Sequence, residues 1–228
     1  MENFDKFKFK LNKLYYFIFK ERFNEKINFN FPNNLNRWDL IQKIIKLKKF
    51  KSYLEIGCDS NDSFSKIIIE KKVGVDPVAG GNFKGTSDQF FFQNKDYFDC
   101  IFIDGLHEYD QVYKDLENSI HFLNNSGIIF LHDTLPSSIH QQAVPRYKRI
   151  WNGDVWKVIV NFRTNENYNI VTCNIDHGVT ILQKIKNKNI LNIYNKEFKK
   201  LKFKDFYNNY KEYMNIIDYD QVFEYLKD

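Results

Sequence analysis

The sequence predicts an α/β protein with a doubly wound, mostly parallel β-sheet. Apolar runs typical of buried strands occur at residues 51–56, 73–76, 98–103 and 127–131. Segments of helical periodicity separate most of them, and this alternation favours parallel strands joined by right-handed crossovers. Glycine or acidic residues follow several of these strands directly, as at a ligand-binding sheet edge.

We expect one domain with an extension at each end. The 228 residues suit a single α/β domain better than two. Residues 1–36 form an aromatic extension with one helix over about 5–24, residues 37–184 carry the regular pattern, and residues 185–228 form a basic helical tail. A further helix, from 37 to about 47, is expected to lead into the first strand.

The regular part predicts further helices and a closing hairpin. Each helix is indicated by apolar side chains at helical spacing behind a capping residue. The helices are expected at 62–69, 86–91, 110–123 and 154–160, and the hairpin strands at 168–173 and 178–182. Asp62 or Ser63 is expected to cap the first helix.

The composition is that of a soluble globular protein, which we expect to be cytoplasmic. No run reaches the ~18 apolar residues of a membrane span, and residues 14–19 are too short for the apolar part of a signal peptide. Cys58, Cys100 and Cys173 are far apart and lack CxxC spacing, so neither a disulfide framework nor a zinc site is implied.

The net charge of +5 is concentrated in the tail. Residues 184–204 contain eight lysines and one acidic residue, Glu197. Such a segment could bind nucleic acid or an anionic membrane surface. An amphipathic helix with a solvated lysine face is favoured instead, so nucleic acid is not expected as a partner.

The first strand and its turn predict a ligand cradle. Glu55 lies on the strand, and Gly57, Asp59, Asn61 and Ser63 follow it. Asn61 suits a tight turn because asparagine tolerates a left-handed backbone. A turn that binds nothing is the alternative interpretation.

Asp76 ends the second strand, where α/β nucleotide folds hold a ribose. A dinucleotide fold needs glycine where this chain has Asp59 and Asp62. These carboxylates would repel a pyrophosphate and attract an ammonium or sulfonium group. S-adenosylmethionine is therefore the expected ligand. The residues expected to bind it are Glu55, Gly57, Asp59, Asn61, Ser63, Asp76, Ser87, Asp88 and Asp104.

Two later strands deliver further polar residues to the same sheet edge. Asp104 and His107 follow the strand at 98–103, and His132 and Asp133 follow the strand at 127–131. Carboxyl ends of neighbouring parallel strands form the binding crevice of open sheets. Taken singly, these residues could be helix caps or hydrogen-bonded core histidines.

The joint pattern over about 37–182 resembles the class I S-adenosylmethionine-dependent methyltransferases, specifically the small-molecule and sugar O-methyltransferases of polysaccharide and natural-product pathways. The matching pieces are Glu55-Ile56-Gly57, Gly74-Val75-Asp76-Pro77, Thr86-Ser87-Asp88, 102–107, 127–129 with His132-Asp133, and 151–157. The resemblance implies a Rossmann-like, seven-stranded sheet whose last strand is antiparallel, with the cofactor over the first two strand ends.

The resemblance also implies roles for the later residues. His107 is the expected base for the acceptor hydroxyl, with His132 the next candidate. Asp104 and Asp133 would position the hydroxyl or hold Mg²⁺, as carboxylates do in metal-dependent relatives. The expected partner is a small-molecule acceptor such as a sugar or nucleotide sugar. The tail is expected to pack as a lid over the acceptor pocket, and a homo-oligomer is left open.

Two other classes of function stay open. Some proteins of this fold are small-molecule hydroxylases, in which His107, His132 and Asp133 would hold iron as a two-histidine, one-carboxylate site. The acidic first loop argues against that class. A non-catalytic binding protein, with its basic tail docked on an enzyme complex or an anionic glycan, is the other alternative.

Overall fold

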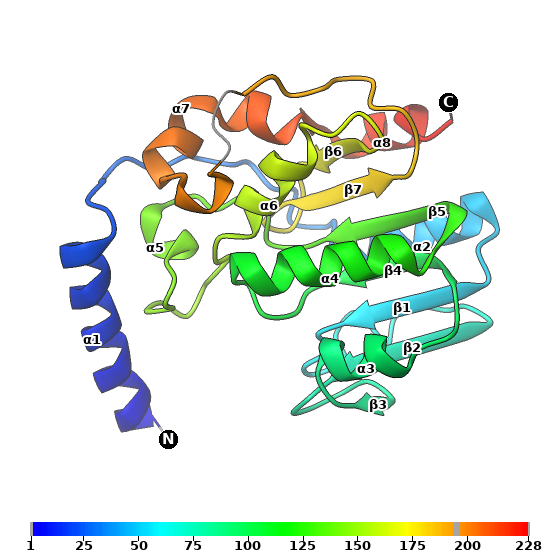
Figure 1. Ribbon diagram of the computed structural model, residues 1–228, viewed down its shortest axis with the longest axis horizontal. Helices are drawn as coiled ribbons and strands as arrows, with labels where there is room; N and C mark the ends of the chain where they lie inside the picture. The colour runs from blue at the N-terminus through cyan, green and yellow to red at the C-terminus, as the bar shows by residue number, and fades with distance from the viewer. Residues whose placement is uncertain (1, 194–196, 228) are drawn as a thin grey trace.

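The computed structural model describes residues 2–193 and 197–227. Helices and strands alternate along most of the chain (Figure 1). In order they are α1 (Glu2–Phe19), α2 (Arg37–Lys48), β1 (Ser52–Ile56), β2 (Lys71–Asp76), β3 (Phe83–Lys84), α3 (Ser87–Gln93), β4 (Phe98–Ile103), α4 (Tyr109–His121), β5 (Leu123–Leu131), α5 (Ile139–Gln142), α6 (Val155–Phe162), β6 (Asn169–Cys173), β7 (Val179–Gln183), the 3₁₀ helix η1 (Phe198–Lys200), α7 (Phe203–Met214), β8 (Ile216–Ile217) and α8 (Tyr219–Tyr225).

The sheet is mostly parallel, as predicted. Its strand order is β3-β2-β1-β4-β5-β7-β6-β8, and β7 runs antiparallel to both of its neighbours. The predicted number of strands, seven, is wrong by one, because the described residues form an eight-stranded sheet. The added edge strand β8 comes from the tail and pairs in parallel with β6 through only two residues.

Helices cover both faces of the sheet, which explains why the central strands are apolar throughout. In Figure 1, α3, α4 and α6 lie in front of the sheet and α2 lies behind it. The front helices share one buried apolar cluster with the sheet, and α2 and α8 share a second. The central strands β1, β4 and β5 are therefore buried between two layers of apolar core.

The helix expected at 62–69 is not present, and residues 62–66 form turns instead. Side chains from other elements bond the backbone groups that a helix would need. Gln42 of α2 accepts a hydrogen bond from Ile68 N at 2.6 Å and donates to Ile68 O at 3.1 Å. Lys72 Nζ donates to Phe64 O and Ile67 O. Asp62 and Ser63 therefore do not cap a helix, and the helix-dipole argument does not apply to this loop.

The amphipathic helix expected at 184–204 is also wrong for the described part of that segment, in which only η1 and the first two residues of α7 are helical. Polar side chains tie this segment to the body: Asn187 Nδ2 donates to Arg163 O, and Lys184 Nζ donates to Leu123 O. The helices of the tail are α7 and α8. Phe206 of α7 packs on Trp156 of α6, with ring centroids 4.7 Å apart.

The first helix ends earlier than expected, at Phe19 rather than near residue 24. It stands at the side of the molecule in Figure 1, and Phe7, Leu14 and Phe19 are more than half exposed on it. None of the described helices combines the length and the apolar character needed to cross a bilayer.

Candidate active site

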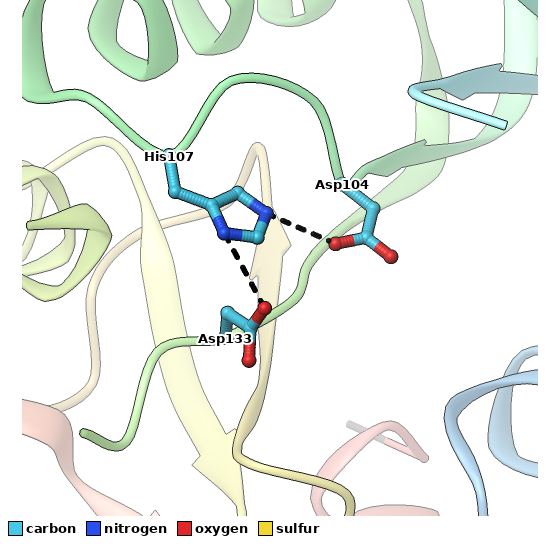
Figure 2. A group of neighbouring side chains, drawn as sticks. All are labelled: Asp104, His107 and Asp133. Atoms are coloured by element: carbon cyan, nitrogen blue, oxygen red, sulfur yellow. Dashed lines mark hydrogen bonds and ion pairs between the residues drawn. The ribbon is translucent and has the colours of Figure 1, made fainter. Parts of the chain in front are cut away.

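Four predicted residues meet at the carboxyl ends of β4 and β5. Asp104 follows β4 directly, His107 lies three residues later, and His132 and Asp133 follow β5. Figure 2 shows the His107 imidazole between the carboxyl groups of Asp104 and Asp133. The nitrogen His107 Nε2 lies 3.3 Å from Asp104 Oδ1, and Nδ1 lies 3.4 Å from Asp133 Oδ2.

His132 belongs to the same network. Its Nδ1 lies 3.1 Å from Asp104 Oδ1, and its Nε2 lies 2.7 Å from the carbonyl oxygen of Asp176. Asp104 Oδ1 therefore faces both imidazoles. His132 is 6% exposed, so it is buried.

Two residues that the sequence analysis did not single out complete the charge network. Arg37, the first residue of α2, places Nε 3.4 Å from Asp104 Oδ2 and Nη1 3.0 Å from Asp176 Oδ2. Asp176 lies in the turn between β6 and β7, where its φ of 42° is left-handed. No periodicity or motif links these residues to β4, so only the folded sheet reveals them.

Two glycines allow the backbone to approach the site closely. A Cβ on Gly57, whose φ is +87°, would lie 2.3 Å from Asp104 O. A Cβ on Gly153, whose φ is +60°, would lie 1.7 Å from His107 O. Any larger residue would displace the loops that carry Asp104 and His107.

The site lines a cavity of about 430 Å³, within the range of small-molecule sites. Eight of the predicted residues line it: Glu55, Gly57, Asp59, Ser63, Asp104, His107, His132 and Asp133. Arg37, Arg146, Arg149 and Trp151 are among the residues that the sequence analysis did not place there. Among the described residues, none after His177 lines this cavity, so the described part of the tail does not cover it in this structure.

Four predicted cofactor residues lie outside this lining. Asn61, with a left-handed φ of 66° as expected, bonds Gly81 N through Oδ1 at 2.7 Å. Asp76 Oδ1 accepts from Val78 N and Ala79 N, and its Oδ2 accepts from Asp59 N.

Ser87 and Asp88 instead face α4. Gln111 Nε2 donates to Ser87 Oγ at 3.1 Å, and Lys114 Nζ forms an ion pair with Asp88 at 2.6 Å. Both side chains therefore have partners within the protein, at the start of α3. Their expected role in binding the cofactor stays a prediction.

Charge attraction dominates the ionisation of the cluster. Burial would raise the pKa of Asp104, but the neighbouring His132 and His107 outweigh it and hold that pKa well below its usual range. Burial would lower the pKa of His107, but the hydrogen bond to Asp104 and the charge of Asp133 raise it. The pKa of His132 is raised strongly for similar reasons. In the protein alone, both imidazoles therefore favour the protonated form.

Glu55 is ionised less readily than a free carboxylate. Burial raises its pKa to about 7, although a hydrogen bond from the Tyr53 hydroxyl to Oε2, 2.5 Å long, favours the charged form. A cation bound in the cavity would favour the ionised form of Glu55.

The donor set fits a divalent cation. Among the described residues, one ligand atom from each of Asp104, His107 and Asp133 lies within 4.8 Å of the others. Asn152 Nδ2 supports Asp133 through a 2.9 Å hydrogen bond, and the buried Asn152 Oδ1 has no hydrogen-bond partner within the described protein. Two carboxylates suit a hard cation, and the imidazole widens the choice to transition metals.

Comparison with known proteins gives a family for the central part of the chain. Residues 55–134 match a family model described as a methyltransferase domain. No curated protein sequence matches the chain.

Solved structures share the fold. One, from Staphylococcus aureus and assigned as a caffeoyl-CoA O-methyltransferase, has 19% identity over 66% of this chain and 84% of that chain, with a TM-score of 0.52. Another, from Klebsiella pneumoniae and assigned as an O-methyltransferase, has 13% identity over 68% and 84%, with a TM-score of 0.52. The Podospora anserina methyltransferase PaMTH1, with SAH bound, has 15% identity over 79% and 87%, with a TM-score of 0.50.

The sheet has the mostly parallel order of a Rossmann-like α/β fold, and residues 55–134 within it match a methyltransferase domain. The matched span contains the motifs that follow β1, β2 and β4.

Proposed function

We propose that the protein transfers the methyl group of S-adenosylmethionine to a hydroxyl oxygen of a small-molecule acceptor. The observation that carries the proposal is that one cavity contains both Gly57 and Asp59 of the first loop and the cluster of Asp104, His107 and Asp133. The acidic first loop suits the cationic cofactor, and the cluster suits a hydroxyl that must lose a proton.

A hydroxylated metabolite, such as a sugar or nucleotide sugar of polysaccharide or natural-product biosynthesis, is the proposed acceptor. The cavity walls support this class because they carry carboxylates, imidazoles and arginines rather than a continuous apolar surface. Such groups can hydrogen-bond several hydroxyls at once.

The cluster offers two ways to activate the acceptor. In the first, Asp104, His107 and Asp133 hold Mg²⁺ or another divalent cation, which would bind the acceptor oxygen and lower the pKa of its hydroxyl. Binding would require a neutral His107 and therefore release its proton. In the second, His107 itself takes the acceptor proton, with His132 as the next candidate. Both ways need the neutral His107, so its raised pKa opposes each of them in the protein alone.

The iron-dependent alternative has less support. It needs His107, His132 and Asp133 as ligands, whereas the convergent set among the described residues is Asp104, His107 and Asp133. His132 Nε2 is already 2.7 Å from the Asp176 carbonyl. A binding protein without activity would bind S-adenosylmethionine but not consume it.

The test is formation of S-adenosylhomocysteine from S-adenosylmethionine with a panel of nucleotide sugars, other hydroxylated metabolites and phosphorylated acceptors. Asp104→Asn and Asp133→Asn should abolish turnover, and Asp220→Asn, a matched change at an exposed position on α8, should not. Loss of activity with EDTA that Mg²⁺ or Mn²⁺ restores assigns activation to a metal, and indifference to EDTA assigns it to His107. Full turnover in both Asn variants would contradict the proposed site.

A further inference from the structure

A second cavity adjoins the candidate active site. It has a volume of about 820 Å³ and lies between residues 26–30 of the N-terminal extension and residues 137–150, which follow β5. Arg149 and Ile150 line both cavities. A molecule long enough to pass these two side chains could occupy both.

Backbone pairing builds this second cavity. Lys26 forms an isolated antiparallel bridge with Ser138, and Ile27 N donates to Ser137 O at 2.9 Å. Ile27 is 6% exposed, so its side chain anchors the extension in the core. The N-terminal extension thus forms one wall of a cavity beside the active site.

The second cavity is lined by basic side chains, whereas the active site is rich in carboxylates. Lys26, Lys148, Arg149 and His140 line the second cavity, and no carboxylate of the described chain does. Within the described residues, no carboxylate lies at ion-pair distance from Lys26, Lys148 or Arg149. Arg37 in the active site, by contrast, has two such carboxylates. Three cations are therefore available to a ligand.

The pKa of His140 is affected by the same positive charges. Burial lowers its pKa, and the positive charges of Lys148, Lys13 and Lys26 lower it further. Its Nδ1 lies 2.9 Å from the Tyr147 hydroxyl. The cations from separate segments therefore act together on one point of this cavity.

We propose that this basic cavity binds the phosphate groups of the acceptor, so that the acceptor is a phosphorylated, hydroxylated metabolite with a diphosphate. Lys26, Lys148 and Arg149 would hold the diphosphate, and the hydroxyl would reach past Arg149 to Asp104 and His107. Three unpaired cations match the two or three charges of a diphosphate better than the single charge of a carboxylate. The inference rests on the proposed function, because it names the acceptor class of the same site.

The test uses inorganic pyrophosphate as the probe, titrated calorimetrically into the full-length protein at low salt. Lys26→Gln and Lys148→Gln should each weaken pyrophosphate binding about fivefold or more, because each removes one of the positive charges that would contact the probe. Lys95→Gln removes an exposed lysine elsewhere and should leave pyrophosphate binding unchanged. S-adenosylhomocysteine should bind Lys26→Gln and Lys148→Gln as it binds the unaltered protein, since neither lysine lines the first cavity.

The outcomes separate this inference from the proposed function. Absence of pyrophosphate binding, or equal binding in all three variants, would overturn the assignment of the basic cavity as a phosphate site. S-adenosylhomocysteine binding is a separate readout that tests the proposed methyltransferase function. If S-adenosylhomocysteine displaces pyrophosphate, the pyrophosphate is bound in the first cavity, and this result would also overturn the inference. Pyrophosphate binding that is weakened about fivefold or more in the two cavity variants and unchanged in Lys95→Gln supports the inference.

Discussion

Replacing Glu55 by Gln should stabilise the protein at alkaline pH. Glu55 lies on β1 with 1% of its surface exposed, beside the hydroxyl of Tyr53 and the first loop. Burial raises its pKa from 4.5 to about 7, and the charge of Asp104 adds to that effect. Gln keeps the shape of the side chain but has no charged form to bury.

The direction follows from proton linkage. The unfolded chain ionises Glu55 near pH 4.5 and the folded chain near pH 7, so the unfolded state binds fewer protons between these values. The contribution of Glu55 to stability is therefore lost as the pH rises through this window. The difference between the two pKa values corresponds to about 3 kcal/mol of unfolding free energy above pH 7.

Urea unfolding of both proteins at pH 5 and pH 8 measures the effect. The Gln variant should gain about 2–3 kcal/mol over the unaltered protein between these two pH values. Contributions of His107 and His132 are common to both proteins and largely cancel in the comparison. A difference between the two proteins that does not change from pH 5 to pH 8 would refute the raised pKa of Glu55.

Three further predictions concern the cofactor, the candidate base and the tail. Asp76→Ala should weaken S-adenosylmethionine binding by about 1.5–3 kcal/mol in calorimetry, because a charged acceptor of ribose hydrogen bonds is lost; unchanged affinity would remove the ribose role. His107→Ala should lower turnover ~10²–10⁴-fold with little change in cofactor affinity. If the imidazole is the base, turnover of the unaltered protein should rise with pH through the raised pKa of His107, whereas near-native turnover of the variant would exclude this role. Phe206→Ala should cost about 3–5 kcal/mol in urea unfolding because it leaves a cavity against Trp156, and a neutral result would contradict the packing of α7.

The central strands, and the polar residues at their carboxyl ends, could be predicted because the sequence patterns that indicate them are local. The apolar runs of β1, β4 and β5 reflect burial on both faces, and the carboxyl ends of parallel strands share one edge. That rule alone brings Asp104 and Asp133 together, since β4 and β5 are neighbours in the sheet.

Contacts between distant segments account for what the sequence did not reveal. Gln42 and Lys72 bond the backbone of Phe64, Ile67 and Ile68, so a segment that was expected to be helical forms turns. Arg37 and Asp176 reach the site from a helix start and a hairpin turn, and Arg37 N also donates to Asp176 Oδ2 at 3.0 Å. Local patterns carry no information about Arg37 and Asp176, which are 139 residues apart in the chain.

The central claim is most directly tested by calorimetric titration of the full-length protein with S-adenosylmethionine and, separately, with NAD. The cavity that joins the acidic first loop to Asp104 predicts one-to-one binding of S-adenosylmethionine, with a dissociation constant in the range of ~1 μM–1 mM typical of enzyme substrates, and much weaker binding of NAD. Equal or tighter binding of NAD, or no binding of S-adenosylmethionine at millimolar concentration, would contradict the account.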